Sequence, residues 1–197
     1  MKHSIRAGLA AVALGIALFS APLVVHADGD DTALTNLVAL ASQRLALAEP
    51  VARWKWANHK PIEDPAREAE LLASVEQRAA RAGVDPAFAR TFFEDQIAAS
   101  KDVQNALFAA WRATRPPEGA PPDLATSTRP KLDRLTQAML TGLAQVEPLR
   151  AAPDCQARLA RSIANWKSLT RYDAGQAQAL GTALSHVCAA GGASAIG

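Results

Sequence analysis

The stretch Phe92-Phe93-Glu94-Asp95-Gln96-Ile97-Ala98-Ala99-Ser100-Lys101-Asp102-Val103-Gln104 carries the pattern that decides the fold. Ile97, Ser100 and Gln104 recur at spacings of three and four residues, which places them on one face of a helix. The same face continues through apolar side chains to Trp111, so Ser100 and Gln104 lie within an apolar stripe. Buried polar groups need partners. Either a structural hydrogen-bond network or a ligand would supply them.

The composition extends this helical prediction to the whole chain. Of 197 residues, 49% are hydrophobic, while β-branched and aromatic residues are scarce and Ala is common. We therefore expect an all-α, single-domain bundle of about six helices, long enough to bury a core. The formal net charge of +2 excludes a strongly basic nucleic-acid binder and an acidic disordered tail.

Proline and capping signals divide the chain into these helices. An apolar repeat from Leu34 to Ala48 predicts a first helix, which Pro50 should kink or interrupt before it resumes through the tryptophans that follow. The Pro-rich stretch 115–123 cannot be helical and predicts a surface connection. The other expected helices run from Asp64-Pro65 to about Gly83, from Asp85-Pro86 to about Thr114, from about Arg129 to Val146 with Ser127 or Thr128 as cap, and over 154–169 and 174–190.

The N-terminus has the pattern of a secretory signal peptide. Lys2 and Arg6 precede an apolar run from Ala7 to Leu23, and small residues at Ala27 predict cleavage there, leaving a domain over 28–197. A membrane anchor is the alternative, but the run is at the short end for a span and no second segment follows. Cleavage would remove two cations and no acid, so the mature chain would be formally neutral. We expect it in the periplasm or secreted, and not on the membrane.

Export also decides how the only two cysteines are interpreted. In an oxidising compartment, an even count favours one disulfide, Cys155–Cys188. Closing a loop of about 30 residues would stabilise the fold by about 3 kcal/mol in the chain-entropy model. The alternative is a metal site that includes His186. Because paired ligand spacing and a fourth ligand are missing, we expect no metal.

Two cations fall on faces that should otherwise be apolar. At about 100° per residue, Arg44 and Lys55 are separated by about three full turns, so both point to one side. Lys55 also lies between Trp54 and Trp56. Each cation either extends out of the core along its aliphatic stem or lines a polar cavity within it.

Taken in order, these residues resemble the active-site series of a known family. The series Arg44, Lys55, Asp64, Arg67-Glu68, Ser100 and Gln104 is similar to that of the all-helical (AroQ-type) chorismate mutases. The surrounding stretches Val51-Ala52-Arg53-Trp54-Lys55-Trp56 and Pro61-Ile62-Glu63-Asp64-Pro65-Ala66-Arg67-Glu68 resemble its exported subclass. The resemblance covers nearly the whole mature chain, including the Pro-rich connection and the cysteine pair. The leader also has a counterpart in that subclass.

The resemblance implies an intramolecular isomerase that rearranges chorismate to prephenate without a cofactor. Arg44 and Arg129 would bind the substrate carboxylates, and Arg67 would add positive potential. The two catalytic residues, Lys55 and Gln104, would donate hydrogen bonds to the ether oxygen. The remaining expected contacts are Ser100 at a carboxylate and Glu68, with the backbone near Asp64, at the ring hydroxyl.

Two assignments depend on local variation within the family. Arg134 is the alternative to Arg129 as the arginine of the fourth helix, and Arg129 is preferred because it follows Thr128 at the helix start. Some exported members carry Glu in place of Gln104. A glutamate must be protonated to donate, whereas an amide is always a donor. We therefore expect activity without a requirement for acid.

The resemblance also implies an organisation. The catalytic half would span about 33–147, and a disulfide-pinned helical half about 148–190. The expected partners are the small-molecule substrate and a second copy of the chain, in a homodimer with an active site within each chain.

The alternative function is a non-catalytic periplasmic helical binding protein or chaperone. That function leaves unexplained why four polar residues fall on core-directed faces, namely Arg44, Lys55, Ser100 and Gln104.

Overall fold

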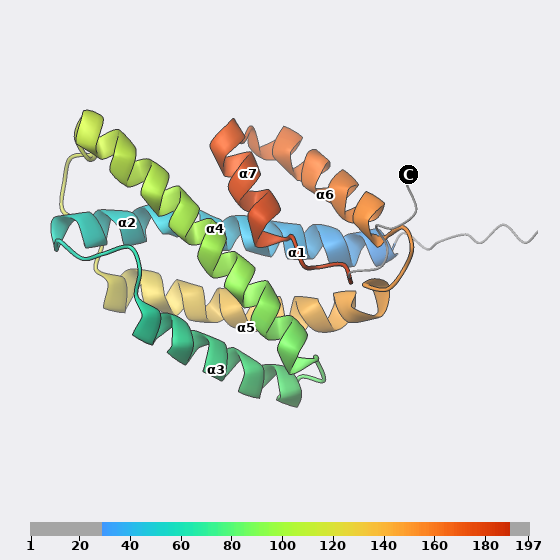
Figure 1. Ribbon diagram of the computed structural model, residues 1–197. Coiled ribbons are helices and arrows are strands. Elements are labelled where there is room, and N and C mark those ends of the chain that lie inside the picture. The colour runs from blue at the N-terminus through green and yellow to red at the C-terminus, as the bar shows by residue number, and fades with distance from the viewer. Residues whose placement is uncertain (1–28, 190–197) are drawn as a thin grey trace, which may run out of the picture.

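The computed structural model describes residues 29–189, and the expected signal peptide, 1–27, lies outside this range. The described chain is helical and contains no strand. Its elements are α1 (Gly29–Leu45), α2 (Ala48–Ala57), α3 (Pro65–Arg81), α4 (Pro86–Ala113), a π-helical turn (Leu124–Thr128), α5 (Arg129–Val146), a 3-10 turn (Glu147–Leu149), α6 (Cys155–Thr170) and α7 (Ala174–Ala183). Helices α1 and α2 run end to end (Figure 1) and count as one interrupted helix. The predicted all-α bundle of about six helices is confirmed.

Helices α1 and α4 form the centre of the bundle. Figure 1 shows α4 crossing α1, with α3 and α5 on one side and α6 and α7 on the other. Helix α1 packs on α5 and α6, and α4 packs on α3 and α7. The two largest fully buried side chains, Phe92 and Phe93, come from α4, and Leu34 and Leu37 of α1 are fully buried as well. Burying such a side chain contributes about 1.5–3 kcal/mol.

The interruption between α1 and α2 comes one turn before the proline that causes it. Helix α1 ends at Leu45, and Pro50 is the third residue of α2. A proline lacks the N–H of the helical hydrogen bond, and its ring clashes with the carbonyl four residues earlier, here that of Ala46. Pro50 therefore fits in the first turn of a new helix and breaks the preceding one at Ala46.

The capping predictions are confirmed for two helices and wrong for a third. The Asp64 carboxylate accepts the Arg67 N–H at 3.2 Å, and that of Asp85 accepts the Ala87 N–H at 2.9 Å. Before α5, neither Ser127 nor Thr128 caps the helix. Asp123 instead accepts the Thr126 N–H at 2.9 Å, and the Ser127 hydroxyl donates back to the Asp123 carbonyl. A π-helical turn thus leads into α5.

The last helix is shorter than the predicted 174–190. Helix α7 ends at Ala183 because side chains of α4 take over the backbone groups that a continued helix would use. The Gln96 amide donates to the Ala183 carbonyl, and the Asp95 carboxylate accepts the His186 N–H at 3.1 Å. The His186 ring also contacts Asp95, with Nδ1 2.9 Å from the carboxylate.

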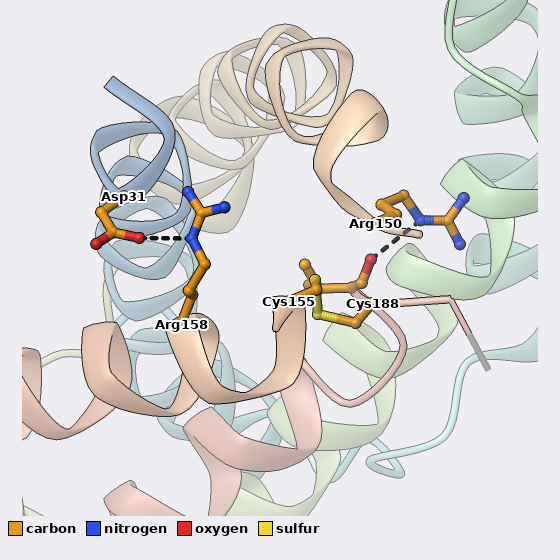
Figure 2. Close-up of a disulfide and its surroundings, with 6 residues drawn as sticks. Asp31, Arg150, Cys155, Arg158 and Cys188 are labelled. Carbon is orange, nitrogen blue, oxygen red and sulfur yellow. Dashed lines mark hydrogen bonds and ion pairs between the residues drawn. A yellow bond between two sulfur atoms is a disulfide. The ribbon is translucent and has the colours of Figure 1, made fainter. Parts of the chain in front are cut away.

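The predicted disulfide between Cys155 and Cys188 is present, and it joins the start of α6 to the segment after α7. Both sulfurs are used in it, so the metal alternative with His186 loses its thiolate ligands. Figure 2 shows two arginines on either side of this bond. Arg158 donates to Asp31 of α1 at 2.8 Å, and Arg150 donates to the Val187 carbonyl at 3.0 Å. Within residues 29–189, no helix has the length and apolar character needed to cross a membrane.

Replacing both cysteines by serine should lower the free energy of unfolding by about 3–4 kcal/mol, because the disulfide closes a loop with a sequence separation of 33 residues. Urea denaturation of the wild type and of the Cys155→Ser/Cys188→Ser variant measures this. The wild type in reductant serves as control and should match the variant. A loss below about 1 kcal/mol would show that the disulfide does not limit the unfolded chain in this way.

Candidate functional site

A cavity of about 170 Å³ lies where α1, α2, α3, α4 and α5 meet. Its walls come from segments that are far apart in the sequence. The structure brings all eight residues singled out by the sequence to this cavity, namely Arg44, Lys55, Asp64, Arg67, Glu68, Ser100, Gln104 and Arg129.

Two charged residues of the lining, Lys101 and Asp133, are not among the predicted site residues. Lys101 precedes Gln104 by one helical turn, and Asp133 follows Arg129 by one turn. Helical spacing from these two predicted residues could therefore have identified both. The apolar wall of the cavity was not predicted from the sequence either. It consists of Val51, Ile62, Leu71, Ile97, Leu124 and Leu132.

The two arginines of α5 that the sequence could not fully separate lie in different places. Arg129 lines the cavity, whereas Arg134 lines a shallow surface hollow beside Leu40 and Leu135. Geometry therefore favours Arg129 over Arg134 as a residue of this site. Arg67 lies at the exposed edge, where its guanidinium is 3.2 Å from the Glu70 carboxylate of the same helix.

Arg44 is the most deeply buried cation of the site. It is 8% exposed, and its Nε has no hydrogen-bond partner among the residues that the structure describes. Its guanidinium carbon lies 5.9 Å from the centre of the Phe93 ring. Burial lowers the pKa of Arg44 to about 10, and the charge of Asp133 partly opposes this shift. Because about 10 is still far above neutral pH, Arg44 carries a positive charge in the cavity wall.

Lys55 is half-buried and also experiences opposing effects. Burial lowers the pKa of its ammonium group, while the charges of Asp64 and Glu68 raise it. The Lys55 Nζ donates a hydrogen bond to the backbone carbonyl of Ile62, in the loop between α2 and α3. This bond uses one of three ammonium donors and leaves two for other acceptors.

The Glu68 carboxylate is held from two directions. It accepts the backbone N–H of Asp64 at 3.3 Å and the Lys101 ammonium at 3.1 Å. The Asp64 side chain meanwhile caps α3. The start of α3 thus supplies the first of these bonds, and the middle of α4 supplies the second. Glu68 therefore has a defined orientation at the cavity.

Ser100 and Gln104 lie one turn apart on α4, as the sequence predicts. The Gln104 amide nitrogen donates to the carbonyl and to the hydroxyl of Ser100, both at 3.1 Å. Its amide oxygen is buried and has no hydrogen-bond partner in the described part of the chain. A structural network therefore satisfies only part of this pair, and one polar atom remains available to a ligand.

The charges around the cavity do not balance. Five cations face three carboxylates, an excess of two positive charges, with the cations Arg44, Lys55, Arg67, Lys101 and Arg129 and the acids Asp64, Glu68 and Asp133. In a partly dry cavity these charges act more strongly than they would in water. A small molecule with two negative charges would complement the site, and the arginine forks suit carboxylates in particular.

Comparisons with known proteins place the chain among well-described relatives. The family model "Chorismate mutase type II" matches residues 35–105. The secreted chorismate mutase of Mycobacterium tuberculosis is 36% identical over 187 residues, covering 91% of this chain and 92% of the relative.

Solved structures give the same result. The chorismate mutase of Burkholderia thailandensis is 76% identical, with a TM-score of 0.78 over 80% of this chain and 99% of the other. The secreted chorismate mutase of Yersinia pestis, at 23% identity and a TM-score of 0.59, covers 76% of this chain and 95% of its own, and it supports the fold alone.

Replacing Arg44 by Met should raise the free energy of unfolding by about 1–2 kcal/mol. An unpaired buried charge is costly, and a side chain of similar length keeps the apolar packing. Urea denaturation at neutral pH measures the change, with Arg81→Met, at the exposed end of α3, as the matched control. A destabilised Arg44→Met variant would mean that the guanidinium contributes to folding more than its burial costs.

Proposed function

The chain belongs to the chorismate mutase family, and on this premise we propose that it is an exported enzyme that converts chorismate into prephenate. The observation that carries the proposal is the convergence of eight separated residues on one cavity with an excess of two positive charges. Chorismate is a dianion, so its charge complements that of the cavity. The names of the secreted relatives agree with the signal peptide expected from residues 1–27.

The reaction requires the protein to position the substrate and stabilise its developing charge, and it requires no nucleophile or base from the protein. The enolpyruvyl chain folds over the ring, the C–O ether bond breaks, and a C–C bond forms within the same molecule. Negative charge develops on the ether oxygen as that bond breaks. A site that holds the reactive conformer and donates hydrogen bonds to this oxygen lowers the barrier. The proposal therefore assigns no cofactor.

Two arginines hold the carboxylates in this proposal. Arg44 has an unpartnered Nε in the buried wall, and Arg129 stands at the start of α5. A guanidinium can meet a carboxylate with two parallel hydrogen bonds, which fixes orientation as well as position. Arg67 adds positive potential from the rim, and Ser100 assists at one carboxylate.

Lys55 and Gln104 act on the ether oxygen. Lys55 keeps two ammonium donors beyond its bond to Ile62, and Gln104 directs its amide toward Ser100 when no ligand is bound. The dianion would favour the charged form of Lys55 and so oppose the effect of burial on its pKa. Lys55 thus has ammonium donors available before the transition state forms, whereas the Gln104 amide would turn from Ser100 to the ether oxygen.

Glu68 and the backbone of Asp64 hold the ring hydroxyl. A hydroxyl can donate to a carboxylate and accept from a backbone N–H. Lys101 keeps Glu68 in this orientation through its 3.1 Å contact. All eight residues belong to one chain, which supports an active site within each subunit of the homodimer that we propose.

A binding protein or chaperone is the competing function, and it predicts no turnover. Incubating the mature protein with chorismate and following the loss of substrate absorbance distinguishes the two. We expect turnover, and Lys55→Ala should lower kcat by about 10²–10³, as removal of one such donor does in other enzymes. Lys167→Ala, on the exposed side of α6, is the matched control and should keep full activity. Full activity in Lys55→Ala would refute the role assigned to Lys55.

Replacing Gln104 by Glu should make the enzyme dependent on acid. A buried carboxylic acid donates a hydrogen bond only when protonated, and burial raises its pKa. The ratio of variant to wild-type kcat, measured between about pH 5 and 8, should therefore rise as the pH falls. Gln156→Glu, on the exposed surface of α6, should show no such trend. A ratio that stays flat with pH would contradict the role of Gln104 as the donor.

A further inference from the structure

A second cavity, of about 250 Å³, lies on the outer side of Lys55. It is formed by the C-terminal end of α2 and the last two turns of α4. Its lining consists of Lys55, Trp56, His59, Lys60, Phe108 and Arg112. None of the roles assigned above uses this cavity, and Lys55 is the one lining residue that it shares with the first.

One wall of this cavity, which we call the outer pocket, is aromatic. The rings of Trp56 and Phe108 meet edge to face with centroids 5.1 Å apart. The Trp111 ring also packs edge to face on Trp56, with centroids 5.7 Å apart. Phe108 and Trp111 are buried, while Trp56 is half-buried. The wall therefore offers a fixed apolar surface to a flat ring.

The rim of the outer pocket is cationic and uncompensated. Lys60 and Arg112 are exposed, and within residues 29–189 neither forms an ion pair. Among the described residues, no acidic side chain lines the pocket. The rim thus attracts anions and has nothing to offer an ammonium group.

The turn that follows α2 places two of these residues. Lys60 N–H donates to the Lys55 carbonyl at 2.9 Å, and His59 N–H donates to the Trp56 carbonyl at 3.2 Å. His59 has φ 52°, the left-handed conformation in which glycine usually ends a helix. A histidine in this position costs some stability and contributes an imidazole that lines the pocket.

We propose that the outer pocket is a second binding site, for an organic anion that joins a carboxylate to a flat apolar ring. The ring would lie in the corner between the nearly perpendicular rings of Trp56 and Phe108, and the carboxylate would lie between Lys60 and Arg112. Because the pocket has no acidic residue, the ligand should lack an ammonium group. Since Lys55 lines both cavities, an anion bound here lowers the positive potential available to a dianion in the first cavity.

Binding is tested by NMR with 3-phenylpropanoate as the probe. The mature chain should contain two histidines, His59 in the outer pocket and His186 beside Asp95. The ring resonance of His59, assigned by its loss in His59→Gln, should shift as the probe is added at constant ionic strength. That of His186 should stay unchanged. Phenylalanine, which adds only an amino group, and the neutral 3-phenylpropanamide should each bind at least about tenfold more weakly.

Two variants decide where the probe binds. Lys60→Ala/Arg112→Ala should weaken the probe about tenfold, because both rim cations are lost. Arg129→Gln alters only the first cavity and should leave the His59 titration unchanged. A His59 resonance that does not move, or a shift that disappears in Arg129→Gln, would overturn the proposal. Equal binding of the amide would overturn it as well.

The effect of an anion in the outer pocket on substrate binding in the first cavity, through Lys55, is measured separately. This part of the proposal rests on the proposed function. The probe should raise the KM for chorismate, and Lys60→Ala/Arg112→Ala should need about tenfold more probe for the same rise. An unchanged requirement would place the inhibition in the first cavity and overturn the coupling. If the enzyme shows no turnover at all, the proposed function fails, while the His59 titration still decides whether the outer pocket binds the anion.

Discussion

The burial of Arg44, which forms no ion pair within residues 29–189, is the constraint on which the site depends. A charge that is 8% exposed is stable only if the surrounding core holds it in place, and here the ring of Phe93 and the helices α1, α4 and α5 do so. The missing partner is what a substrate carboxylate would supply. The cost of desolvating the guanidinium is therefore met during folding, before any ligand arrives.

The acids of the site serve the helices as well as the cavity. Asp64 begins α3 through its side chain and holds Glu68 through its backbone N–H, so one capping interaction defines both a helix start and the orientation of a carboxylate. Lys101 completes the arrangement from α4. The three carboxylates thus balance part of the positive charge and leave an excess of two. This local excess is more informative than the net charge of the chain.

Helix α4 carries different functions on its two faces. Ser100 and Gln104 face the cavity, whereas Asp95 and Gln96 bind the end of α7. The disulfide then joins the segment after α7 to α6, which is itself attached to α1 through Arg158 and Asp31 (Figure 2). In this way the C-terminal helices cover the side of α4 that lies away from the cavity, and they support the site without lining it.

Capping aspartates, prolines and helical spacing act locally and place residues on helix faces, so the sequence alone predicts most of the helices. The eight residues of the cavity came from the resemblance to known chorismate mutases. How the helix faces meet depends on the tertiary structure. The contact between Lys101 and Glu68, the unpartnered Nε of Arg44 and the early end of α7 depend on distances between helices. Such distances follow from the packing of whole side-chain surfaces. No pattern along one helix contains them.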